Sequence, residues 1–196
     1  MAHRLGEMAA AQGWQRLLLI GPATTTESVA GFLPDSLRRL LIGQLDRNLI
    51  HAPLGELGSS VGRHLHEWKR RVELKEVEDL LSDARSGRRA CIGIDASLDR
   101  LNERQIERLY LRADLSLSGF RDGHGRLLTR SPQPPDGQPY VVEPRLVERM
   151  VVAALESGAS VIPLEGESAG KLGLSGGVGA RLRWRNGGGP SNGGNP

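Results

Sequence analysis

The sequence predicts an α/β protein made of two small α/β units, residues 1–86 and 87–185, followed by a glycine-rich disordered tail at residues 186–196. Short apolar runs alternate with amphipathic helical patterns along the chain, which is typical of α/β sandwiches. The 196 residues are enough for one ordinary domain or two small ones. Ser86 and Gly87 end a long helical pattern, so the boundary between the units is predicted there.

The first unit is expected to begin with a short helix and a buried strand. Residues 14–20 (WQRLLLI) have the composition of that strand, and Gly21-Pro22 ends it. Thr24 and Glu27 have the spacing of a capping box at the start of the next helix. An apolar stripe then predicts a long helix that starts at Ser59 or Ser60. The expected elements are helix 2–13, strand 14–20, helix 24–33, a helical turn at 34–39, strand 40–48 and helix 59–84.

The second unit alternates strands and helices. Asp95 is placed to cap a helix, and Asp122-Gly123 lies at the centre of a hairpin. Pro144 suits a first helical turn, and Gly158 ends that helix. The expected elements are strand 90–94, helix 96–101, strand 106–111, a hairpin or an irregular excursion at 118–130, a loop at 131–139, helix 143–157, strand 159–164 and strand 178–184.

The composition predicts a soluble protein without a membrane partner. Apolar residues make up 38% of the chain and charged residues 25%, and no apolar run approaches the roughly 18 residues of a membrane span. The N-terminal segment lacks the apolar core of a signal peptide. A single cysteine, Cys91, excludes an internal disulfide and fits a reducing compartment. We therefore expect a cytoplasmic location.

The net charge of +3 is unevenly placed. The chain from residue 171 onward has no acidic residue and four basic ones: Lys171, Arg181, Arg183 and Arg185. The three arginines alternate with Leu182 and Trp184, so they would share one face of the final strand. This pattern has two interpretations, a contact for a polyanion or a solvated sheet edge that charge keeps from aggregating.

Residues 173–177 read Gly-Leu-Ser-Gly-Gly and match the G-x-S-x-G nucleophile elbow of α/β-hydrolases. The elbow requires a helix after the serine, with an acid and then a histidine later in the chain. The segment after Gly177 alternates with the period of a strand, and no Asp or His follows Ser175. The sequence therefore predicts no serine hydrolase site.

No other motif predicts catalysis, a cofactor or a metal. The turn at residues 21–24 lacks both glycine-rich phosphate-binding patterns and is interpreted as an ordinary turn between strand and helix. His64 and His66 are two residues apart, so on a helix they point in different directions and are expected at the surface. Asp122 with His124 is too small a set for a metal site, and Cys91 is interpreted as an inert buried thiol.

Three segments of the second half stand in a distinctive order: ACIGIDASLDRLNERQIERLYL, RLVERMVVAALESGASVIPLEGE and KLGLSGGVGARLRW. This order resembles the third domain of archaeo-eukaryotic class 1 peptide-chain release factors and of Pelota. Residues 14–57 resemble the latter part of the second domain of those proteins. The chain also resembles the shorter bacterial archaeo-eukaryotic release factor-like (baeRF) family, to which the ribosome hibernation factor Balon is related.

The resemblance implies a fold and a role for each half. The second half would be an α/β/α sandwich like the kink-turn-binding ribosomal proteins, and the first a partial second domain. The glycine-rich turn before the last strand would be a scaffold feature, in which Gly176, Gly177 and Gly179 let the chain turn tightly and approach a neighbouring element. The segment that matches the RNA contact of kink-turn binders, residues 93–99, carries two aspartates and no basic residue, which disfavours RNA binding there.

The family's catalytic loop is absent from the sequence. Release factors hydrolyse peptidyl-tRNA with a Gly-Gly-Gln loop, whereas here Ile42 precedes Gly43-Gln44 and no Gly-Gly-Gln occurs. The resemblance therefore implies a non-catalytic translation factor of the hibernation, rescue or surveillance type. It would bind the ribosome through rRNA and ribosomal proteins, with a translational GTPase as a further partner and no DNA. The alternatives are a protein-interaction scaffold or truncated family remnant with no ribosomal role, or a hydrolase or nuclease that uses Ser175, His124 or Asp122.

Overall fold

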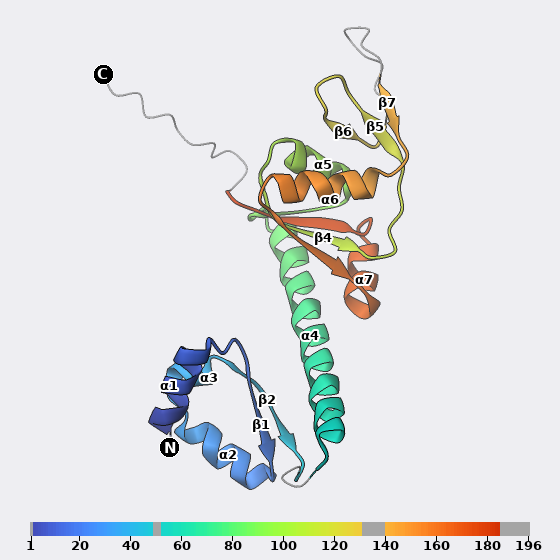
Figure 1. Cartoon of the computed structure of the whole chain (residues 1–196). Helices are drawn as coiled ribbons and strands as arrows, with labels where there is room; N and C mark the ends of the chain where they lie inside the picture. The colour runs from blue at the N-terminus through green and yellow to red at the C-terminus, as the bar shows by residue number, and fades with distance from the viewer. Residues whose placement is uncertain (1, 49–51, 131–139, 185–196) are drawn as a thin grey trace, which may run out of the picture. The chain divides into compact units, whose positions relative to one another are not determined.

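The computed structural model describes residues 2–48, 52–130 and 140–184, and the predicted loop at 131–139 and the predicted tail lie outside them. Helices and strands alternate along most of the chain, as predicted (Figure 1). Two compact units are present, residues 1–72 and 73–196, so the division by contacts falls inside a long helix. The predicted boundary at Ser86-Gly87 stays a prediction, although the helix does end at Arg85, beside a Gly87 of φ 63°.

The first unit is built on a two-stranded parallel sheet. The strands β1 (Leu17–Gly21) and β2 (Leu41–Asp46) pair in parallel. The helices are α1 (Ala2–Gln12), α2 (Ala23–Phe32), α3 (Asp35–Arg38) and the first part of α4 (Leu54–Arg85). Ala9, Leu33 and Leu37 form a small buried core. The predicted elements are confirmed in kind and order.

Two helix starts in this unit were predicted wrongly. Helix α2 begins at Ala23, and no capping side chain of its own bonds to its first turn. The Ala23 N–H instead donates to the Asp46 carboxylate at the end of β2, 3.1 Å away. Helix α4 begins at Leu54 rather than at Ser59, because the Pro53 carbonyl already accepts the N–H groups of Glu56 and Leu57.

The second unit contains a four-stranded sheet in the order β3-β9-β4-β8. Its strands are β3 (Ala90–Ile92), β4 (Ile106–Arg112), β8 (Ser160–Leu164) and β9 (Val178–Leu182). Strand β9 is antiparallel to both β3 and β4, whereas β4 and β8 are parallel. The interpretation of the final strand as a solvated sheet edge is therefore wrong, because β9 is bonded on both sides.

Helices cover both faces of this sheet, which confirms the α/β/α sandwich (Figure 1). Helices α5 (Ile94–Asn102) and α6 (Leu146–Glu156) pack on one face against Leu109 and Ala180. The end of α4 and helix α7 (Gly166–Gly173) pack on the other face around Tyr110, which is fully buried. Alternate residues of β4 thus serve two separate cores.

A second, three-stranded antiparallel sheet lies between β4 and α6 in the chain. It has the order β6-β5-β7, with β5 (Gly119–Arg121), β6 (Leu127–Leu128) and β7 (Val141–Glu143). The predicted hairpin is confirmed, whereas β7 and α7 were not predicted. Asp95 does not cap α5: the helix starts at Ile94 after Gly93, and the Asp95 carboxylate accepts the Thr129 hydroxyl instead.

Candidate functional site

The glycine-rich turn connects α7 to β9. Gly176 and Gly177 have φ values of 90° and 75°, in the left-handed region that favours glycine. The N–H groups of Ser175 and Gly177 both donate to the Leu172 carbonyl, at 2.9 and 3.0 Å, and so bind the turn to the end of the helix. These contacts favour a scaffold role for the turn.

Gly179 allows a close approach between layers. A Cβ atom at this position would lie 3.0 Å from Cδ2 of Leu80, which belongs to α4, and 3.2 Å from the Cys91 carbonyl oxygen. Both distances are shorter than an ordinary van der Waals contact. Glycine therefore lets the end of α4 rest directly on the sheet.

The surroundings of Ser175 differ from a nucleophile elbow in their order. An elbow lies between a strand and a following helix. Here the helix α7 precedes the serine and the strand β9 follows it. This inverted order disfavours a serine hydrolase, as the missing downstream Asp and His already did.

Arg181 faces α4 and is paired. Its Nη1 donates to Oδ2 of Asp83 at 2.9 Å, and Arg88 binds the other carboxylate oxygen at 3.2 Å. The hydrogen bond from Arg181, with a smaller contribution from Arg88, holds the pKa of Asp83 below its usual value. Both groups of the Asp83–Arg181 pair are mostly shielded, with 21% and 30% of their side chains exposed. The pair therefore joins α4 to β9.

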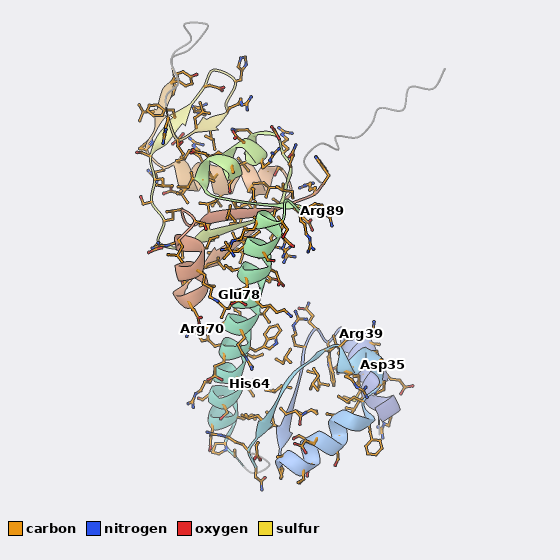
Figure 2. All side chains as sticks on the ribbon, turned by 180° about the vertical axis from the view of Figure 1, so that it is seen from behind. Asp35, Arg39, His64, Arg70, Glu78 and Arg89 are labelled. Atoms are coloured by element: carbon orange, nitrogen blue, oxygen red, sulfur yellow. The ribbon has the colours of Figure 1, made fainter. Side chains whose placement is uncertain are left out.

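The other predicted basic residues in the described chain are also engaged. Arg183 donates to the carbonyls of Ile106 and Ser157, at 2.9 and 2.6 Å, and so binds the end of α6. Lys171 forms an ion pair with Glu78 of α4, which Figure 2 labels. Arg185 lies outside the described residues. Arg181 and Lys171 thus both pair with acids of α4, whereas Arg183 binds the end of α6.

The acidic partners on α4 were missed by the sequence interpretation. Glu76 accepts hydrogen bonds from Arg108 at 3.1 Å and from the Tyr110 hydroxyl at 3.4 Å, and it joins Glu78 and Asp83 beside the apolar stripe. Burial is the main reason that the pKa of Tyr110 is raised. The sequence did contain a signal for these pairs, namely acidic residues beside the apolar stripe of α4. Acids at the margins of a helix that packs on strands with basic residues are placed to form ion pairs with them.

The remaining candidate groups do not form a catalytic site. Burial raises the pKa of the Cys91 thiol, which suits an inert role. Asp122 accepts N–H bonds from His124 and Arg126 within the hairpin tip. Among the described residues, no cluster of three or more His, Cys, Asp or Glu side chains has the arrangement of a metal site. None of the described helices has the length and apolar character needed to cross a bilayer.

Two observations in the first unit bear on the sequence interpretation. The Asp46 carboxylate occupies the N–H of Ala23, so the turn at residues 21–24 already holds an anion of the chain itself. His64 (Figure 2) was expected at the surface, but its Nε2 atom is buried and makes no hydrogen bond with the described part of the chain. It packs directly against Gly43, where a Cβ atom would overlap with Nε2.

No protein-family model matches the chain, and no curated protein matches it by sequence. Solved structures do. Archaeoglobus fulgidus Pelota aligns over 93% of this chain and 54% of its own, with 20% identity and a TM-score of 0.51. Archaeal Pelota in a ribosome-bound model with ABCE1 aligns over 94% of this chain and 47% of its own, with 18% identity and a TM-score of 0.56.

The yeast protein gives the same result. Dom34 of S. cerevisiae, a translation termination-like factor involved in RNA quality control that interacts with Hbs1, aligns over 88% of this chain and 48% of its own. The identity is 11% and the TM-score 0.55. The chain thus spans about half the length of each of these proteins. It is similar in fold to the C-terminal halves of Pelota and Dom34.

Proposed function

We propose that this chain is a non-catalytic, ribosome-associated translation factor of the hibernation, rescue or surveillance type, within the baeRF group. The observation that carries the proposal is the similarity in fold to Pelota, which is ribosome-bound in one of the matched structures, over 94% of the chain. The absence of Gly-Gly-Gln from the sequence supports a role without peptidyl-tRNA hydrolysis. The factor would act in the cytoplasm by steric occupation, with the ribosome and a translational GTPase as partners.

In this proposal, the basic residues that already have internal partners stabilise the fold and do not contact RNA. Arg181 and Lys171 hold α4 on the sheet, and Arg183 holds the end of α6. Using any of them for RNA would require breaking an internal contact. Arg185, which lies outside the described residues, stays a candidate for direct contact on the basis of the sequence pattern.

The experiment is cosedimentation of the purified chain with vacant bacterial ribosomes through sucrose at about 50 and 200 mM salt, a range over which phosphate contacts weaken visibly. Binding that reaches a plateau and falls with salt supports the proposal. No cosedimentation at the lower salt contradicts it.

The second candidate is a protein-interaction scaffold, which the exposed apolar side chains favour. Leu174 is 91% exposed, and Leu155 and Val152 of α6 are 56% and 45% exposed. Exposed apolar side chains are available to an interface with a partner protein, where such patches are common. A scaffold would remain in the supernatant when ribosomes are pelleted, so the same assay separates the two functions.

A further inference from the structure

An open concavity of about 410 Å³ lies in the second unit, where the end of α5, the β5–β6 hairpin and α6 meet. None of the predicted basic residues lines it. Its charged and polar lining is dominated by Arg104, Arg121, His124, Arg126 and Arg149, with Glu156 as the one carboxylate in the lining. The arginines come from three separate parts of the fold, which the sequence alone does not bring together.

The charge in the concavity is not neutralised internally. Arg149 donates to Glu143 at 3.2 Å. The side chains of Arg104, Arg121 and Arg126 make no ion pair or hydrogen bond with another described residue. Four arginines against Glu143 and Glu156 leave an excess of two positive charges. Other arginines of this unit, such as Arg108 and Arg181, have carboxylate partners.

The frame that presents these arginines is held by specific hydrogen bonds. The Asn102 side chain both donates to the carbonyl of Leu127 and accepts its N–H, each at 3.0 Å, which joins α5 to the hairpin. The Asp122 carboxylate accepts the N–H groups of His124 and Arg126, at 2.9 and 2.8 Å. This acid is therefore directed into the hairpin tip.

Arg104 has an unusual backbone conformation. Its φ of 55° makes it the only non-glycine residue with a positive φ in the described part of the chain. Glycine or asparagine adopts this conformation at lower cost. An arginine at the end of α5 is thus unfavourable for the turn, and its side chain lines the concavity. The position points to a use for the guanidinium.

We propose that this concavity binds phosphate groups of an RNA backbone, which under the proposed function is ribosomal RNA; that identification rests on the proposed function. Guanidinium groups match phosphate oxygens in charge and geometry. The described lining contains no Phe, Tyr or Trp, and its one aromatic ring is that of His124, whereas its charged groups are mainly guanidinium groups that match phosphates. The site therefore reads phosphates and not base identity.

The test compares two triple variants of the whole chain. The first replaces the unpaired arginines of the concavity: Arg104→Gln, Arg121→Gln and Arg126→Gln. The matched control removes the same charge from exposed arginines of α4: Arg63→Gln, Arg70→Gln and Arg71→Gln (Arg70 is labelled in Figure 2). Each variant should fold like the wild type because neither set of substitutions removes a described contact. Circular dichroism and urea unfolding check this.

Binding of a fluorescein-labelled, 20-nucleotide RNA is measured by anisotropy between about 50 and 200 mM salt. Each lost phosphate contact should lower the slope of log affinity against log salt concentration by about 0.7. The fold-change in affinity between the two salt concentrations should therefore be about twentyfold smaller when three contacts are lost. The concavity variant should show this loss and the control should not. Equal behaviour of the two variants, or no RNA binding by the wild type, overturns the proposal.

Two further arms separate the sources of phosphate and the two proposals. GTP and inorganic phosphate are added as competitors. If they displace RNA only at millimolar concentrations of competitor, the result supports an RNA backbone as the ligand. If GTP binds tightly and RNA does not, the result overturns the proposal. Ribosome cosedimentation runs in parallel. If wild type and concavity variant both pellet with the ribosomes and do so to the same extent, the concavity proposal fails while the proposed function stands. If the wild type binds RNA through the concavity but does not pellet, the proposed function fails alone.

Discussion

Replacing Gly179 with alanine should destabilise the second unit. The added Cβ atom would lie 3.0 Å from Leu80 Cδ2, 3.2 Å from the Cys91 carbonyl oxygen and 3.3 Å from Leu172 Cδ1. These atoms belong to α4, β3 and α7, so moving the Cβ atom away from one of them brings it closer to another. The carbonyl is backbone of a paired strand and moves only if the β3–β9 register is disturbed. Overpacking of this kind costs about 1–3 kcal/mol.

Urea unfolding followed by circular dichroism measures this cost. With an m-value of about 2 kcal/mol per molar, a loss of 2 kcal/mol lowers the midpoint by about 1 M. Gly170→Ala is the matched control, because it lies inside α7 with nothing within 4 Å of its would-be Cβ. That substitution should stabilise the unit by about 0.5–1 kcal/mol. If Gly179→Ala were as stable as the wild type, the close packing of α4 on β9 would be refuted.

Three other perturbations test the contacts around the sheet. Asp83→Asn should lower the urea midpoint at pH 7; because the folded-state pKa of Asp83 is lowered, the difference from wild type should shrink as the pH falls below about 4, and a pH-independent difference would contradict this. Arg183→Ala should destabilise the unit by about 1–3 kcal/mol, since it leaves the carbonyls of Ile106 and Ser157 without this donor; an unchanged melting temperature would contradict the contact. Cys91 should react with a thiol reagent at pH 7 more slowly than a free cysteine, because burial raises its pKa, and equal rates would contradict its burial.

Much of the fold followed from local patterns. The alternation in residues 178–184 predicted β9, and glycines at positions 87 and 158 predicted two helix ends. These signals are local, because period and positive φ depend on a few neighbouring residues. Helix α7 was missed since its three glycines disfavour a helix in isolation. Burial of Ala169 and Leu172 against the sheet stabilises it.

The site was harder to predict, because its contacts are distant in sequence. Asp83 and Arg181 are separated by 98 residues, so the basic pattern near the C-terminus gave no indication that its charges are used internally. The capping role assigned to Asp95 failed for a similar reason, since Thr129 of the hairpin region binds that carboxylate. Likewise, only the packing of α5, the hairpin and α6 gathers the arginines of the concavity.

A binding titration with ribosomes is the decisive experiment for the proposal that this chain is a ribosome-associated translation factor. Increasing amounts of the whole chain are added to a fixed amount of vacant bacterial ribosomes, and the pelleted fraction is quantified at low salt. We expect a plateau that corresponds to a single class of sites, reached at higher concentrations of the chain as salt is raised. A chain that stays in the supernatant at every concentration, or that pellets in proportion to its concentration without a plateau, would contradict the claim that it is a translation factor.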